Sequence, residues 1–549
     1  MKPIIAVALI CAASLIACAQ APVQGGSTAV QSGNAKGEIV ASHIAELLKA
    51  LESEGANSAI RELVQIGTPA FDPLIGALKN SNPTVRKQAA FALGLIGDPR
   101  GTGNLAIHLG AATADPEVEV RQATFYGLIA MLVATIETPD GVYQDGNAYS
   151  ASRSVLVQLG SASVDPLFSA LDSDNPDLRA AAADVLWRFQ DARVVDRLIL
   201  LLKDPVSQVR TAAASALGFA RDPKAVPPLI NALGDNDENV RIYAAGALAY
   251  FHDERVIEPL IRRLSDTSSG VRSAAIMSLQ SLDDPRIVAA LIRMLSDTDD
   301  TVRYWAVDGL GRKKDPRAIK PLIDRLIDKE DRIREGAAKA LGNLKAVAAV
   351  PQLLVLLSDP ASNVRMEAAE ALGRIGDKRA VASLMGMLSD HDPWVRSSAV
   401  DGLGYMGDPS AVDVLILALK DSFSRVVLSA IEALGAFQDS RSIEALVCIL
   451  SYDDEVLRVT ASLSLGWTQD PRAVDPLLKT LGDTSGWVRA AAACSLGQLR
   501  DKRALEPLQN LTTDSSGQAR LAAQTAIDRI NNQKPRQRCT QLEILKEQN

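Results

Sequence analysis

The chain has 549 residues, of which 47% are hydrophobic and 23% charged, with a mean hydropathy of +0.06, a net charge of −8 and a pI near 5.3. This apolar content excludes disorder by composition. The acidic balance disfavours nucleic acid as a partner, because phosphate binding depends on Lys and Arg. Such a length suggests several globular domains unless the sequence repeats internally.

The N-terminus, residues 1–17, has the pattern of a secretion signal. Lys2 precedes an apolar run over residues 4–17, which is too short to span a bilayer. The sequence Leu15-Ile16-Ala17-Cys18 resembles the lipobox of prokaryotic lipoproteins. The resemblance implies cleavage before Cys18, a lipid on its sulfur, and anchoring to a membrane of the cell envelope, facing the periplasm or the exterior. The alternative is an ordinary cleaved signal followed by a coincidental cysteine.

Three further segments are expected to lie outside the regular part of the chain. Residues 18–37 are rich in Ala, Gln, Gly and Ser without apolar periodicity, which predicts a flexible tether. Residues 134–150 contain Pro-Asp-Gly and Asp-Gly-Asn, which predict a protruding loop. Residues 532–549 form a polar C-terminal tail.

From residue 38 to residue 531 a single pattern repeats every 31 residues. One copy contains Asp222-Pro223, then Leu229, then the anchor dipeptide Val240-Arg241, and ends in an Ala-rich stretch with Leu248. The first half has apolar residues at helical spacing after a Pro, and the second has Ala three and Leu seven residues after the anchor. We therefore predict an all-α solenoid of about fifteen to sixteen helical hairpins.

The recurring Asp-Pro, Pro-Leu, Asp, Val-Arg and Ala-Leu-Gly elements resemble HEAT repeats of the short kind first associated with phycobilin lyases. This resemblance covers about nine tenths of the chain. It implies a right-handed α-solenoid in which the first helix of each hairpin lies on the convex side and the second helix on the concave side.

A recurring pair of charges indicates a structural ladder. Most repeats have an Asp six residues before the anchor Arg, but Asn80, Ser173 and Tyr452 replace it in the repeats that follow the degenerate anchors Gly55, Ala148 and Val427. Because the Arg and the next Asp are lost together, we predict that each Arg pairs with the Asp of the following repeat. The ladder residues include Arg210, Asp235, Arg241, Asp266, Arg272, Asp297, Arg303 and Asp328.

The variable positions of the second helices are the candidate binding surface. At 100° per residue, positions one, five and nine after the anchor point away from the buried third and seventh positions. Exposed aromatic rings beside carboxylates suit a protein or peptide partner with basic groups. The alternative is a solvated face with aromatic rings wedged between repeats. The candidate residues are Tyr243, Tyr250, Tyr304, Trp305, Asp308, Glu370, Asp401, Tyr405 and Trp467.

The residue inventory argues against an enzyme. The four His residues, His43, His108, His252 and His391, are isolated and lack metal-ligand spacing. None is followed by Glu, as in the His-Glu pairs of the iron hydroxylases that share the HEAT fold. We expect no metal and no cofactor. A structural spacer of the envelope, or less favourably a HEAT-fold enzyme of bilin lyase or hydroxylase type, remains as an alternative to the binding scaffold.

The cysteines imply no disulfide framework. If Cys11 leaves with the signal and Cys18 carries lipid, an odd set of Cys448, Cys494 and Cys539 remains. Idle thiols are expected, and an intermolecular disulfide through Cys539 is the alternative.

Overall fold

The computed structural model describes residues 33–53, 56–96, 109–117, 119–121, 123–125, 127–128, 154–437 and 439–532. The predicted signal peptide with Cys18, the loop at 134–150 and residues 533–549 with Cys539 lie outside the described residues. Within them every regular element is a helix, and none has the length and hydropathy needed to cross a bilayer.

The elements alternate between first and second helices of hairpins, as expected for an α-solenoid. The N-terminal pair is α2 (Gly33–Ala50) and α3 (Ala56–Ile66). The first helices are α4 (Thr68–Ala77), α9 (Val164–Leu171), α11 (Arg193–Leu201), α13 (Val226–Ala232), α15 (Ile257–Arg263), α17 (Pro285–Met294), α19 (Ile319–Ile323), α21 (Val350–Leu356), α23 (Val381–Met387), α25 (Val412–Ala418), α27 (Ser440–Ile449), α29 (Val474–Thr480) and α31 (Leu505–Leu511).

The second helices carry the anchors. They are α5 (Pro83–Ile96), α10 (Pro176–Leu186), α12 (Ser207–Ala220), α14 (Glu238–Leu248), α16 (Ser269–Gln280), α18 (Asp300–Lys313), α20 (Asp331–Asn343), α22 (Ser362–Ile375), α24 (Pro393–Met406), α26 (Ser424–Leu434), α28 (Glu455–Trp467), α30 (Gly486–Leu499) and α32 (Gly517–Asn532).

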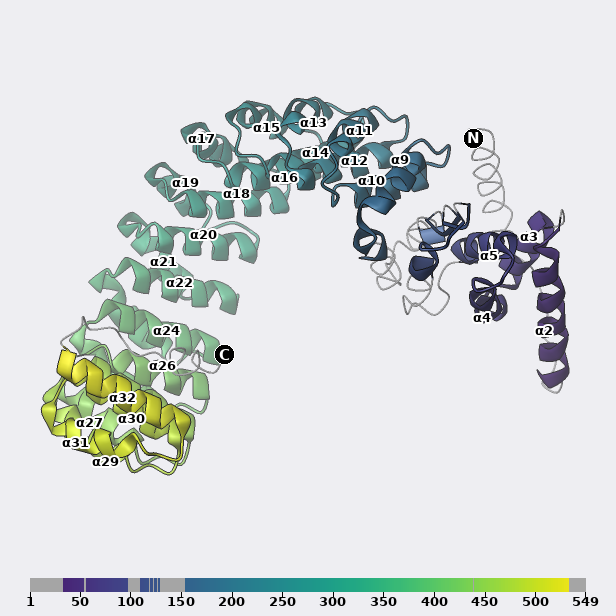
Figure 1. Cartoon of the computed structure of the whole chain (residues 1–549). Coiled ribbons are helices and arrows are strands. Elements are labelled where there is room, and N and C mark those ends of the chain that lie inside the picture. Colours follow the sequence, from purple (N-terminus) through teal and green to yellow (C-terminus); the bar gives the residue numbers. More distant parts are fainter. Residues whose placement is uncertain are drawn as a thin grey trace. The chain divides into compact units, whose positions relative to one another are not determined.

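The chain divides into two compact units, Met1–Leu282 and Asp283–Asn549. From α10 onward, successive second helices inside each unit lie side by side in one layer, and the first helices form a second layer along one side of it (Figure 1). The handedness of the solenoid stays a prediction.

The expected tether overlaps the first described helix. Residues 18–37 were expected to be irregular, but α2 begins at Gly33. Residues 33–37 are Gly-Asn-Ala-Lys-Gly, in which only Ala and Lys favour helix, so this first turn depends on its continuation into residues 38–50.

The start of most first helices is a 3-10 turn followed by an α-helix. In one repeat the turn Pro223–Ala225 precedes α13, and the Asp222 carboxylate accepts a hydrogen bond from the backbone N–H of Lys224 at 2.9 Å. Pro suits the first position because no N–H is needed there. The helix therefore begins three residues later than the Pro alone predicts.

Many of these capping Asp residues also pair with an Arg two residues later, which the sequence analysis did not anticipate. Asp377 accepts hydrogen bonds from Arg379 at Nε and Nη2, at 3.0 and 2.7 Å, and from its backbone N–H. The Arg379 guanidinium, and then this backbone N–H, lower the pKa of Asp377 to about 2. The Asp-x-Arg spacing in the sequence was the available signal.

The core lies between the two helix layers. The third and seventh residues after the anchor, such as Ala244 and Leu248, are fully buried, and Leu229 of the first helix is buried opposite them. Small residues allow neighbouring second helices to approach closely: a Cβ added at Gly373 would lie 2.5 Å from the Cα of Gly402. This contact explains the Ala-Leu-Gly part of the repeat pattern.

The residue that follows or ends several second helices has a positive φ. It is a glycine in two repeats, Gly376 (φ 74°) and Gly407 (φ 63°), which suits a left-handed C-cap. Arg221, Lys314 and Arg500 occupy the same position with φ between 51° and 56°. A side chain with a Cβ is disfavoured there by roughly 1 kcal/mol.

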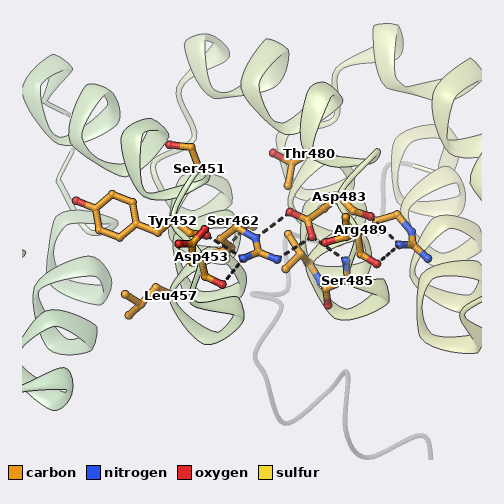
Figure 2. Close-up of polar contacts among 12 residues, drawn as sticks. Ser451, Tyr452, Asp453, Leu457, Ser462, Thr480, Asp483, Ser485 and Arg489 are labelled. Atoms are coloured by element: carbon orange, nitrogen blue, oxygen red, sulfur yellow. Dashed lines mark hydrogen bonds and ion pairs between the residues drawn. The ribbon is translucent and has the colours of Figure 1, made fainter.

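Arg and Asp side chains join neighbouring repeats in a ladder. In one rung, Arg458 Nε donates to Asp483 Oδ2 at 2.9 Å, and Asp483 Oδ1 also accepts from the backbone N–H of Ser485 at 2.8 Å. The next Arg, Arg489, donates from Nη1 to the carbonyl oxygen of Asp483 at 2.7 Å (Figure 2). Each Asp therefore caps its own loop and receives the Arg of the preceding repeat.

The same geometry recurs along the chain. Arg303 Nε lies 3.0 Å from Asp328 Oδ2, and the side chains of this pair are only 6% and 5% exposed. Equivalent pairs separated by 25 residues join Arg179 to Asp204, Arg210 to Asp235, Arg241 to Asp266, Arg334 to Asp359, Arg365 to Asp390, Arg396 to Asp421 and Arg489 to Asp514.

The loop contacts of the ladder are also present at Arg272, in the first unit, and at Asp297, in the second. Arg272 Nη1 donates to the carbonyl of Asp266 at 2.9 Å, and Asp297 Oδ1 accepts from the N–H of Asp299 at 2.9 Å. Where Asn80 replaces the Asp, its side chain still accepts from the N–H of Asn82 at 2.8 Å, and its carbonyl still accepts from Arg86 Nη1 at 2.8 Å.

Candidate functional site

The outward side of the second helices carries most of the candidate residues, and we call it the second-helix face. In the first unit it includes Tyr243 and Tyr250 of the α14 repeat, both exposed. In the second unit Tyr405, at the end of α24, is 70% exposed. These three aromatic rings, which were predicted from the sequence to be accessible on this face, are exposed.

On the α18 part of this face, the candidate side chains already contact neighbours within the chain. Tyr304 and Trp305 are half-buried and meet edge to face with ring centroids 5.2 Å apart. The Arg332 guanidinium lies 4.6 Å from the centre of the Tyr304 ring. Asp308 pairs with Arg312 on its own helix at 2.8 Å, so its charge is already balanced locally.

Four carboxylates of three consecutive second helices form a carboxylate row: Glu367 and Glu370 of α22, Asp401 of α24 and Glu432 of α26. Arg374 donates to Glu367 at 2.9 Å and to Glu370 at 2.5 Å. On α22, two carboxylates therefore share one guanidinium group. The other two carboxylates of the row lie on α24 and α26.

The negative charge of the carboxylate row is only partly balanced by nearby cations. Burial raises the pKa of Glu367, Asp401 and Glu432. The nearest cation to Asp401 is Arg425, whose Nη2 lies 3.9 Å from Asp401 Oδ2, too far for a hydrogen bond. A cationic group from outside would find desolvated negative charge here.

Trp467 and its neighbours differ from the expected open surface. Trp467 packs against a cluster of Leu463, Ala491 and Cys494, and Leu463 is 2% exposed. The adjacent helix α30 covers positions that a single helix would leave facing solvent. Here the alternative of an aromatic ring wedged between repeats is correct.

One of the two described cysteines differs from the prediction that both are idle thiols. Cys494 is buried and takes part in a disulfide bond, rather than being an idle thiol. Cys448 is a free and exposed thiol, as expected.

The first unit also carries an aromatic row made of Trp187, Phe219 and Tyr250, of which only Tyr250 was predicted from the sequence. The Trp187 and Phe219 rings stack with centroids 4.9 Å apart, and the Phe219 and Tyr250 rings follow at 5.3 Å. The available signal was the repeat register: Phe219 and Tyr250 are both the ninth residue after an anchor Arg.

Metal binding finds no support within the described residues. No group of three or more His, Cys, Asp or Glu side chains there is arranged to hold an ion. The carboxylate row is spread over three helices and is interrupted by guanidinium groups.

Neutralising one carboxylate of the row should stabilise the protein. In Asp401→Asn we expect the free energy of unfolding at pH 7 to rise by about 1 kcal/mol, because a desolvated charge is removed and the contact with Ser429 can be kept. The gain should disappear as the pH falls through the raised pKa of Asp401, since the native group is then uncharged too. Urea unfolding at pH 7 and at a pH below the raised pKa of Asp401 measures the difference in free energy of unfolding. Asp308→Asn is the control, and an equal gain there would contradict the explanation.

Comparison with known proteins agrees with this geometry. The family model described as HEAT repeats matches residues 41–129, 164–238, 226–311, 271–342, 319–401, 386–465 and 444–528. These matches cover most of the chain and follow the hairpins of both units.

Among curated proteins, the chain is similar to phycocyanobilin lyase subunit beta of Pseudanabaena tenuis (strain PCC 7409), at 40% identity over 88 residues. The match spans 16% of this chain and 30% of that relative. Among solved structures, an importin beta crystal structure has a TM-score of 0.54 at 14% identity, covering 96% of this chain and 82% of importin beta. A structure of Kap95p with RanGDP has a TM-score of 0.51 at 15% identity, covering 91% and 77%. Both structures show a shared fold.

Proposed function

Because the chain belongs to the HEAT-repeat family, we propose that it is a scaffold whose second-helix face binds a protein or peptide partner with basic groups. The carboxylate row is the observation that carries this proposal. It combines the half-buried carboxylates of Glu367, Glu370 and Asp401 with the exposed carboxylate of Glu432 on the next helix and the exposed ring of Tyr405. Lys or Arg side chains of a partner would supply the missing positive charge, and its apolar groups would cover the ring.

The solved neighbours support a protein-binding role. The Kap95p structure concerns the binding of Kap95p to RanGDP, so a helical solenoid of this kind serves there as a protein-binding surface. The identity of that partner does not transfer to this chain, because the likeness is one of fold alone.

The same proposal includes the location of the protein in the cell. The lipobox pattern ending at Cys18 supports a lipid anchor, with the repeats held in the cell envelope and facing the periplasm or the exterior. In this arrangement the scaffold would collect its partner at a membrane surface.

Affinity capture with the full chain tests the binding face. We expect a partner from an envelope extract to be retained by the natural sequence and lost, by at least about tenfold, from a Glu370→Gln/Asp401→Asn variant. A Tyr304→Ala/Trp305→Ala/Asp308→Ala variant should lose it as well, if the partner extends to α18. Bound proteins are identified by mass spectrometry.

The control is Asp413→Asn, which removes an exposed carboxylate from the first helix α25. Circular dichroism checks that every variant keeps its helices. Equal retention by all variants would overturn the assignment of the face and favour a structural spacer.

A second candidate rests on the phycocyanobilin lyase relative. The local identity of 40% over 88 residues favours a role in handling a bilin chromophore, which would make the chain enzyme-like. Visible absorbance retained by the chain after incubation with a free bilin and gel filtration would support that role.

A further inference from the structure

The aromatic row of the first unit lies outside the repeat core. The buried layer of the α12 repeat is already filled by residues such as Ala213 and Leu217, which are fully buried. Phe219 and Tyr250 are instead 40% and 38% exposed, at the C-terminal ends of neighbouring repeats. A row of three neighbouring rings, of which Trp187 is half-buried and the other two are exposed, offers apolar surface that the core does not need.

Two guanidinium groups border this row. Arg188 lies over the Trp187 ring at 4.4 Å from its centre, and Arg221 lies over the Tyr250 ring at 5.3 Å. Within the described part of the chain, neither guanidinium forms an ion pair with a carboxylate. Arg193, a short distance along the chain, instead has Asp165 and Asp191 as partners. The two cations are thus positioned by rings and left open to an incoming anion.

The backbone at Arg221 has φ 52°, a left-handed conformation that Gly376 and Gly407 adopt in other repeats and that Lys314 and Arg500 also adopt. A glycine fits this conformation with less strain than a residue with a Cβ. Replacing Arg221 by Gly therefore removes the guanidinium without straining the backbone.

We infer that the aromatic row, with Arg188 and Arg221, is a binding surface for an acidic peptide segment that also carries apolar side chains. Carboxylates of the segment would pair with the two guanidinium groups, and its apolar side chains would lie on the Phe219 and Tyr250 rings. The inference rests on the proposed scaffold function, and it assigns the first unit a partner segment of opposite charge to the one expected at the carboxylate row. A protein segment is favoured over nucleic acid, because binding to a phosphate backbone depends on many Lys and Arg contacts and this row has two guanidinium groups beside aromatic rings.

Fluorescence anisotropy on the full chain tests the inference directly. The probe is a short labelled peptide of Asp, Glu and Phe, compared with a matched peptide that has Asn and Gln in place of the acids. The test variant is Arg188→Gln/Arg221→Gly, in which the glycine relieves the positive φ, so that reduced binding cannot come from lost stability. We expect the variant to bind the acidic peptide about tenfold more weakly and the neutral peptide unchanged.

Lys345→Gly is the matched control, because Lys345 also has a positive φ (49°) and lies in the second unit. Glu370→Gln/Asp401→Asn should keep the acidic peptide while losing the basic partner, so failure of one proposal is separable from failure of the other. Equal affinity for the acidic and neutral peptides, no binding of either, or undiminished binding by the double variant would overturn the inference. Tighter binding of a single-stranded oligonucleotide of equal charge would overturn the choice of a peptide.

Discussion

Replacing Arg303 by Met should lower the free energy of unfolding around α18 and α20 by about 3 kcal/mol. The substitution removes both hydrogen bonds from Arg303 to the buried Asp328 carboxylate and leaves it beside Arg325, whose Nη1 lies 3.7 Å away, beyond hydrogen-bond distance. It also removes the donor to the carbonyl of Asp297, which lies 3.0 Å from Arg303 Nη1. Hydrogen exchange of the amides in these helices is the appropriate measurement, since a solenoid opens locally and a single global transition is not assured.

The same chain supplies a control for the Arg303 substitution. Arg312→Met removes an Arg of the same helix whose side chain is 66% exposed and paired only with Asp308, and it should cost less than about 0.5 kcal/mol. Arg303→Met combined with Asp328→Leu should recover most of the loss, because no unpaired charge then remains. Equal effects of Arg303→Met and Arg312→Met would refute the buried-pair account.

Acid should unfold the protein cooperatively, and only below about pH 4. Burial by itself would raise the pKa values of ladder carboxyls such as Asp235, Asp266 and Asp328, but the Arg hydrogen bond and the backbone N–H lower them below the ordinary value of 3.8. In Asp421 and Asp514 the Arg hydrogen bond is the largest effect, and it lowers their pKa as well.

The direction of the pH effect follows from these lowered values. A carboxyl with a lower pKa in the folded state adds stability at pH values above 3.8, and this stability is lost as the pH falls through the folded pKa. Glu367, Asp401 and Glu432 act in the opposite direction, since their raised pKa values favour proton uptake by the native state. Stability should thus stay level or rise slightly from pH 7 to about pH 4 and then fall steeply.

Circular dichroism during an acid titration measures this profile. A loss of helix centred near pH 5 would contradict it, because the ladder carboxyls would still be charged. Asp401→Asn should flatten the slight rise and leave the steep fall in place.

The repeated parts of the fold were predictable from the sequence, and the face was predictable only in part. The Arg and Asp pairs could be inferred because both partners disappear at the same joints, as Val427 and Tyr452 show. The burial of Leu463 could not be inferred from one helix, since it depends on how closely α30 approaches. Small residues such as Gly466, where an added Cβ would lie 2.7 Å from the Cβ of Ser495, set that distance.

Charge balance on the face also depends on neighbours that the sequence does not place. From the sequence, Glu370 and Asp308 were equivalent candidates, because both are carboxylates on the predicted binding face. In the structure Asp308 has Arg312 to itself, whereas Glu370 shares Arg374 with Glu367. The second arrangement leaves negative charge available, so the carboxylate row and not the α18 region is the stronger part of the candidate site.

The ladder makes the repeats interchangeable building units. Most anchor Arg residues reach an Asp 25 residues ahead and a carbonyl six residues behind, as Arg334 does with Asp359 and Asp328. An in-frame deletion or duplication of 31 residues therefore joins an Arg to an equivalent Asp, and the new junction resembles the old one. A gene for such a chain can lengthen or shorten by whole periods without a new interface having to evolve, whereas a change of another length would disturb the rung in which it falls.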